Sequence, residues 1–199
     1  MHKHFSHIIE ARSFIVDKLS SDTLLGRNGF TMYESKYVID YKPQQAWDAE
    51  LLAIALVNNE LAAKGIRVVE VNLYDLVLEH LDFEGLWKVF EERERDLDPD
   101  AIIDALQASA SVEQVIIPSI QEKLRRAEPF DLVFITGVGE TFPYIRTHSM
   151  LNELTSIKPV VLWFPGTYIK SPDGSSSLNI LDIKQGSGGY YRATNLFDL

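Results

Sequence analysis

The sequence predicts a three-layer α/β fold, with a mostly parallel central sheet of about five strands and helices on both faces in a Rossmann-like arrangement. Short apolar runs alternate along the chain with longer segments of helical periodicity. Two of these runs, residues 132–135 and 160–164, are entirely apolar, as strands covered on both faces are. Glycine or proline follows each of them closely and ends it in a turn. We expect the 199 residues to form one domain, 1–199.

Composition limits the classes of function. With 46% hydrophobic and 24% charged residues, the chain is typical of soluble globular proteins, and no run approaches the roughly 18–20 apolar residues of a membrane span. The absence of cysteine excludes disulfides and thiolate chemistry and, with no apolar secretion signal at the N-terminus, favours the cytoplasm. A net charge of −10 disfavours direct binding to nucleic acid, because that needs cations against the phosphates.

The first third of the chain predicts a helix, a strand, a second helix and a second strand. We expect an amphipathic helix over 4–19, a strand over 36–41, a helix over 44–64 and a strand over 66–73. Because a helix connects the two strands, they should be parallel with a right-handed crossover. The apolar residues of the second helix recur with a 3.6 period, at Trp47, Leu51, Ile54, Val57 and Leu61. His2, His4 and His7 are interpreted as solvated imidazoles at a frayed terminus, in preference to a metal cluster.

The middle of the chain is predicted to be helical and partly acidic. Residues 75–106 favour helix with an interruption at 98–100, and a further helix over 111–126 has Ser111 as its candidate N-cap. Asp75, together with Asn72, could line the edge of the sheet, or Asp75 could cap the next helix, which we favour. The aspartates around residue 98 resemble half of a calcium loop, but Ala101 replaces the glycine that such a loop requires.

The segment 130–154 organises the rest of the predicted fold. It contains the strand 132–135, a glycine turn at 136–139, and a helix expected to begin at Thr141 with Pro143 in its first turn. The helix should bury a stripe of side chains, namely Ile145, His148, Leu151 (or Met150) and Leu154. The glycine turn lies at the carboxyl end of its strand, which is where open α/β sheets bind ligands and partners.

The last third predicts a buried strand over 160–164, broken at its carboxyl end by Pro165 and Gly166. A turn-rich surface loop should follow at 171–177, and a short strand at 178–183. Residues 190–192 then close the domain.

The glycine turn could bind an anion through its backbone amides. However, Phe142 stands where the dinucleotide-binding pattern has its third glycine, and Glu140 would repel a phosphate. No lysine lies between Lys123 and Lys158, so a phosphate-binding loop of the Walker type is also excluded.

Arg146 and His148 lie two residues apart, so they cannot share one face of a helix. Arg146 could pair with Glu140 or Glu153, or with a partner's carboxylate. His148 is interpreted as a core histidine in preference to a catalyst. The sequence shows no serine elbow, no assignable pair of carboxylates and no zinc-binding spacing, so we predict no catalytic residue, no metal site and no cofactor.

Aromatic residues and an arginine follow two of the later strands. Tyrosine and arginine often dominate protein interfaces, but these tyrosines could equally pack over the ends of the sheet. The residues concerned are Tyr168, Tyr190, Tyr191 and Arg192. The carboxyl ends of parallel strands meet at one edge of the sheet. The glycine turn, the pair Arg146 and His148, and these aromatic residues could therefore form one surface.

Several motifs give the chain a family resemblance. They are TGVGETFPYIRTHSMLNEL from Thr136, PVVLWFPGTY from Pro159, YYRATNL from Tyr190 and the earlier GIRVVEVNLYDLVLEHL from Gly65. Together they resemble the BrxB family of the bacteriophage-exclusion (BREX) defence systems, from about Tyr37 onward. The resemblance implies a small, non-catalytic component of a multi-protein defence system in the cytoplasm of a bacterium or archaeon. It also implies a partner, the large alkaline-phosphatase-like protein PglZ.

We therefore expect an adaptor that binds a PglZ-type protein through the edge of the sheet or through the acidic helical segment 91–104. The alternative is an α/β protein that binds a nucleotide or phosphate ligand at Gly137-Val138-Gly139. The candidate partner- or ligand-binding residues are Gly137, Gly139, Glu140, Arg146, His148, Pro165, Gly166, Tyr168, Tyr190, Tyr191 and Arg192.

Overall fold

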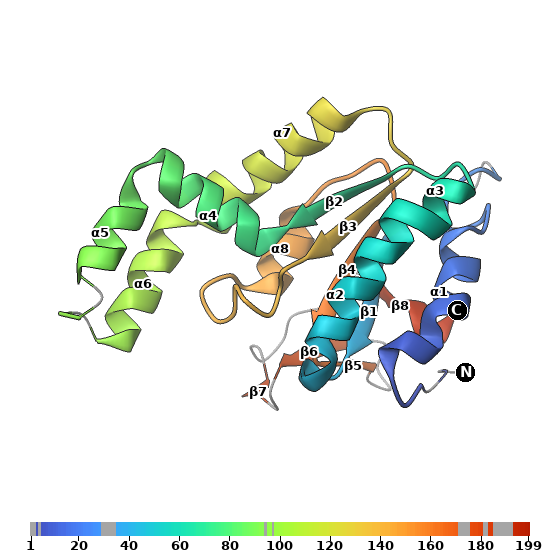
Figure 1. Cartoon of the computed structure of the whole chain (residues 1–199), viewed down its shortest axis with the longest axis horizontal. Coiled ribbons are helices and arrows are strands. Elements are labelled where there is room, and N and C mark those ends of the chain that lie inside the picture. Colours follow the sequence, from blue (N-terminus) through green and yellow to red (C-terminus); the bar gives the residue numbers. More distant parts are fainter. Residues whose placement is uncertain are drawn as a thin grey trace.

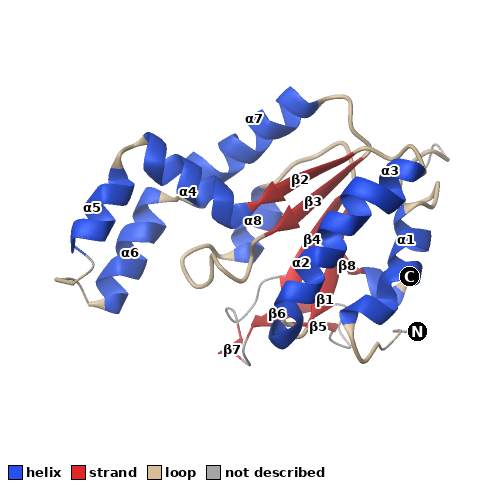
Figure 2. Cartoon of the chain, viewed as in Figure 1, coloured by secondary structure: helices blue, strands red, loops and turns tan. Residues whose placement is uncertain are grey.

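A five-stranded parallel sheet forms the centre of the protein (Figures 1 and 2). The computed structural model describes residues 3, 5–28, 35–93, 95–96, 98–170, 176–180, 183–184 and 193–199. The order of the strands is β2-β3-β4-β1-β8, and every neighbouring pair is parallel. Their bounds are β1 (Lys36–Tyr41), β2 (Val68–Asn72), β3 (Leu132–Thr136), β4 (Val160–Pro165) and β8 (Thr194–Asn195). The predicted three-layer α/β fold is confirmed.

The two central strands are buried along their whole length because helices cover both faces of the sheet. Successive side chains of a strand point to opposite faces. Leu132 and Phe134 of β3 therefore join one hydrophobic cluster, whereas Val133 and Ile135 join the other. The ring of Phe134 meets that of Trp163 edge to face, with 5.6 Å between the centroids.

Different helices cover the two faces. One face carries α1 (Arg12–Leu19), α2 (Ala46–Ala55), a π-helical turn (Leu56–Glu60) and α3 (Leu61–Ala63). The other face carries α4 (Leu73–Phe83), a π-helical turn (Val112–Ile116), α7 (Ile117–Ala127) and α8 (Thr147–Glu153). Short 3-10 helices lie at Ile8–Ala11, Pro43–Gln45 and Leu196–Asp198.

None of the helices in the described ranges combines the length and the apolar character that a bilayer crossing requires.

The helical segment predicted over 75–106 is in fact three helices. A break at Gly85, whose φ of +68° favours glycine, separates α4 from α5 (Leu86–Arg93). The break expected near residue 98 is confirmed, since the Asp98 carboxylate accepts a hydrogen bond from the Ala101 N–H (3.0 Å) and begins α6 (Pro99–Ser109). Neither α5 nor α6 has a buried residue among those described, and the two form an arm beyond α4 (Figure 1).

A second, antiparallel sheet was not predicted. It consists of β5 (Thr167–Lys170), β6 (Ser176–Ile180) and β7 (Ile183–Lys184). Of the loop expected over 171–177, residues 171–175 lie outside the described part, and the strand expected over 178–183 is β6 with part of β7. β5 was not predicted because it is four residues long and largely exposed. It therefore lacks the alternation of apolar and polar residues that marks a half-buried strand.

The two ends of the chain pack together. The Lys3 N–H donates a hydrogen bond to the Phe197 carbonyl (3.0 Å), and the rings of Phe5, Phe14 and Phe197 lie 5.5–6.1 Å apart. His7 is not simply solvated as expected, because its ring accepts a hydrogen bond from the Ile9 N–H and lies 3.2 Å from Asp48. His2 and His4 lie outside the described residues.

Candidate binding site

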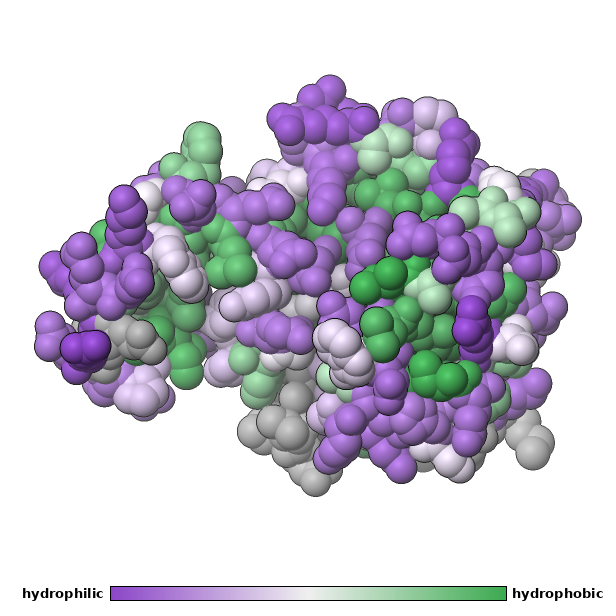
Figure 3. Space-filling view, in the orientation of Figure 1, coloured by the Kyte–Doolittle hydropathy of each residue, from purple (hydrophilic) through white to green (hydrophobic). Residues whose placement is uncertain are grey.

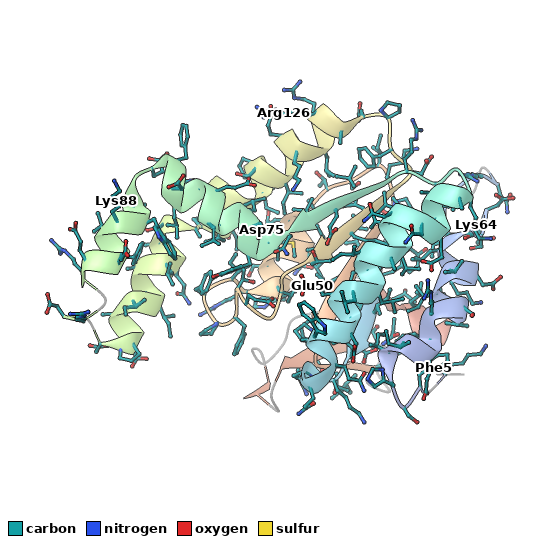
Figure 4. The ribbon with its side chains drawn as sticks, viewed as in Figure 1. Phe5, Glu50, Lys64, Asp75, Lys88 and Arg126 are labelled. Atoms are coloured by element: carbon teal, nitrogen blue, oxygen red, sulfur yellow. The ribbon has the colours of Figure 1, made fainter. Side chains whose placement is uncertain are left out.

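The carboxyl ends of β1 to β4 meet at one edge of the sheet, as predicted. We call this the carboxyl edge. Here an open cleft of about 280 Å³ lies between α2, the start of α4 and the turn that follows β3. Figure 4 shows Glu50 of α2 and Asp75 of α4 on opposite sides of this edge. The cleft is lined by Tyr41, Ala46, Ala49, Glu50, Ala53, Asn72, Tyr74, Asp75, Thr136, Gly137, Glu140 and Trp163.

Asn72, and not Asp75 as predicted, caps α4. Its side-chain oxygen accepts hydrogen bonds from the N–H groups of Tyr74 (3.0 Å) and Asp75 (3.3 Å). Asn72 precedes the first helical residue and has an extended backbone, whereas Asp75 already lies within the first turn. Asp75 is therefore exposed at the cleft with its carboxylate outside the cap.

The side chain of Asn72 also explains why residue 137 is a glycine. Asn72 lies opposite Thr136 in the register of β2 and β3, which places it beside the glycine turn. Gly137 has a φ of +69°, and a Cβ at this position would lie 2.0 Å from the Asn72 side-chain oxygen. Glycine is thus required here for the backbone conformation and for the close contact with the cap.

The glycine turn does not lead directly into a helix, so the predicted start at Thr141 is wrong. Residues 138–144 form turns, and α8 begins at Thr147. The buried Thr141 hydroxyl donates to the Val138 carbonyl (3.1 Å), and this bond stabilises the non-helical course. The glycine turn therefore does not form the N-terminus of α8.

The cleft is acidic. Glu50, Asp75 and Glu140 line it, and no lysine, arginine or histidine is found among its described lining residues. The pKa of Tyr41 is raised by burial and further by the charges of Glu140 and Glu50. The pKa of Tyr144 nearby is raised to about 12 by burial, Tyr74 and Glu140. Both phenols remain protonated at neutral pH, and the surrounding field favours a cation over an anion.

The structure brings some of the predicted site residues together. Gly139 lies next to Pro165, since a Cβ on the glycine would be 3.2 Å from the proline ring. Gly166 packs tightly under the small sheet, because a Cβ there would lie 2.1 Å from the Asn179 carbonyl. Tyr168 holds the same hairpin in place, with its N–H donating to Asp40 (3.0 Å) and its hydroxyl to the Ala193 carbonyl (2.9 Å). Pro165, Gly166 and Tyr168 therefore have packing roles.

Arg146 and His148 lie near the start of α8. Arg146 is exposed, and no ion pair joins it to Glu140 or Glu153 within the described residues. His148 is half-buried, unlike the buried stripe residues Ile145 and Leu154. Burial and the positive charge of Arg146 lower the pKa of His148, so the neutral imidazole is favoured at pH 7. Tyr190, Tyr191 and Arg192 lie outside the described part of the chain.

The sequence interpretation missed the outer face of α2. The apolar period predicted at Trp47, Leu51 and Ile54 points away from the sheet, and these side chains are 69%, 45% and 41% exposed. The buried side consists of Ala49, Leu52, Ala53 and Leu56. Nearly every position of α2 is apolar, so periodicity alone could not select a face. The small alanines were the informative residues, because they let the helix approach the sheet closely.

In the described part of the chain, no three acidic or histidine side chains are placed to hold a metal ion.

The comparisons with known proteins point to one family. A family model described as "BREX protein BrxB" matches residues 69–196. The chain belongs to the BrxB family.

Two BrxB relatives, each named "BREX protein BrxB", are similar over nearly the whole chain. The one from Bacillus cereus (strain H3081.97) is 28% identical over 187 residues, which cover 92% of this chain and 94% of the relative. The one from Escherichia coli O9:H4 (strain HS) is 25% identical over 195 residues, covering 95% and 92%. No solved structure matches the chain. As a BrxB-family protein, the chain is a component of a BREX phage-defence system.

Proposed function

We propose that this protein is a non-catalytic adaptor of its BREX system, acts in the cytoplasm and binds the PglZ-type protein of the same system. The observation that best supports a binding role is the exposed apolar surface of α2 beside the carboxyl edge. Trp47 is 69% exposed although the inner side of the same helix is fully packed. An exposed tryptophan flanked by aliphatic residues is typical of a surface that a protein partner covers.

The alternative, a nucleotide or phosphate ligand at Gly137-Val138-Gly139, has less support. The contact of Gly137 with Asn72 already accounts for that glycine. Glu50, Asp75 and Glu140 surround the position that a phosphate would occupy, and no lining cation offsets their charge. The helix that follows the turn in the chain, α8, begins only at Thr147.

The adaptor role is tested by co-expressing this protein with a tagged PglZ-type protein from the same operon. We expect the two to co-elute in size-exclusion chromatography at micromolar concentrations. An unrelated alkaline-phosphatase-like protein, expressed with the same tag, is the control and should elute separately. Separate elution of the operon's own pair at these concentrations would contradict the proposal.

The ligand alternative is tested by a thermal-shift panel of nucleotides and inorganic phosphate. A ligand present at a hundred times its Kd adds about 2.7 kcal/mol of stability, which corresponds to a rise in Tm of roughly 5–10 °C at this chain length. We expect no ligand of the panel to raise the Tm by more than the scatter of buffer controls. A shift that is concentration-dependent would establish the alternative.

A further inference from the structure

We propose that the outer face of α2 and the acidic cleft together bind a basic, amphipathic segment of a partner protein. A lysine or arginine of that segment enters the cleft between Glu50, Asp75 and Glu140, and its apolar neighbours cover Trp47, Leu51 and Ile54. The inference rests on the proposed function only in requiring a protein partner, and it does not depend on which protein that is.

The apolar part of this surface is continuous. Trp47, Leu51 and Ile54 recur at a spacing of three or four residues, so they lie along one face of α2. Figure 3 shows hydrophobic side chains gathered over this helix and bordered by polar ones. The inner side of α2 does not need these residues, because Leu52 and Ala53 are 2% and 0% exposed against the sheet.

The acidic cleft adjoins the apolar face. Glu50 is exposed and follows Trp47 by one helical turn, so it connects the two parts of the surface. Asp75 of α4 and Glu140 of the turn after β3 also line the cleft. Three carboxylates without a lining cation, in a chain of net charge −10, are complementary to a positively charged side chain.

Trp163 favours an occupant that carries a hydrogen-bond acceptor as well as a positive charge. Its side chain borders the cleft and is 2% exposed, and its indole N–H has no hydrogen-bond partner among the described residues. A buried donor without an acceptor is unfavourable, so an occupant that supplies an acceptor is favoured. A metal ion or a polyamine has no acceptor to offer. A peptide has both, because its lysine or arginine donates and its carbonyl groups accept.

The proposal is tested by selecting binders from a displayed library of random 16-residue peptides against the immobilised full chain. We expect the enriched peptides to contain lysine or arginine flanked by apolar residues. Trp47→Ala and Glu50→Lys should each weaken their binding at least about tenfold, as truncation of an interface anchor or reversal of a contacting charge does. Binding should also weaken as salt is added.

Matched variants on the distant arm separate this surface from general effects. Trp87→Ala removes another half-exposed tryptophan, and Glu84→Lys, where the arm leaves α4, makes the same change in net charge. Both should bind the selected peptides as the wild type does. All four positions are exposed, so circular dichroism and Tm should confirm that the variants fold alike.

Several outcomes would overturn the inference. They are a library that yields no binder, enriched peptides that are acidic, and peptides that bind Glu50→Lys and Glu84→Lys equally well. Self-association of the wild type that Trp47→Ala abolishes would assign the surface to a second copy instead. If the selected peptides bind Trp47→Ala and Glu50→Lys as tightly as the wild type while the PglZ-type protein still binds, this inference fails and the adaptor role stands. If the selected peptides bind as expected but the PglZ-type protein does not bind the wild type, this inference stands and the adaptor role fails.

Discussion

Replacing Phe134 with alanine is expected to lower the free energy of unfolding by about 3–5 kcal/mol, the range for removing a buried aromatic ring. Phe134 is fully buried in β3, between neighbouring strands and under the helices of one face. Its ring packs against Trp163, so the substitution leaves a cavity lined by an indole that cannot move without disturbing β4. Urea denaturation measures the effect as a lower midpoint with an unchanged slope.

Phe83→Ala is the control for this prediction. Phe83 ends α4 and is 86% exposed, so the same chemical change should alter stability by no more than about 0.5 kcal/mol. Equal losses at the two positions would show that Phe134 does not lie in a packed core.

Gly137→Ala is expected to destabilise the protein by about 2–3 kcal/mol. About 1–2 kcal/mol comes from placing an alanine at positive φ, and about 1 kcal/mol from displacing the Asn72 side chain that caps α4. The contact is direct, because the new Cβ would lie 2.0 Å from the Asn72 oxygen. Guanidinium unfolding of the variant measures the total.

Gly85→Ala separates the two contributions. Gly85 has a φ of +68°, and a Cβ added there would meet no atom within 4 Å, so only the backbone cost of about 1–2 kcal/mol should appear. In an Asn72→Ala background, Gly137→Ala should cost less than in the wild type but still more than Gly85→Ala, because the new Cβ would also lie 2.9 Å from the Tyr74 backbone nitrogen. If its cost is the same with and without Asn72, the contact does not contribute.

The central sheet could be predicted because its strands are either continuous apolar runs or connected by clear helices. The residues of β3 and β4 admit no other interpretation, since a run of four or five branched and aromatic residues before a turn is too short for a helix. The carboxyl edge followed from the same argument, because parallel strands place their carboxyl ends together. The start of α8 could not be predicted, since a hydroxyl–carbonyl bond of Thr141 competes locally with helix formation.

The content of the candidate site depends on contacts that no local pattern encodes. The pairing of Asn72 with Gly137 requires the register of β2 against β3, which joins segments more than sixty residues apart. The face that α2 turns outward was decided by Ala49 and Ala53, which fit against the sheet where Trp47 would not. The acidic cleft likewise combines Glu50, Asp75 and Glu140 from three separate segments.

The place of β1 in the sheet has a consequence for biosynthesis. Among the described strands β1 is translated first, but it pairs with β4, where Lys36 lies opposite Val160, and with β8, where Tyr37 lies opposite Thr194. Both edges of β1 therefore stay unpaired in the nascent chain until these much later strands have been translated. The sheet can be completed only after β8 has left the ribosome.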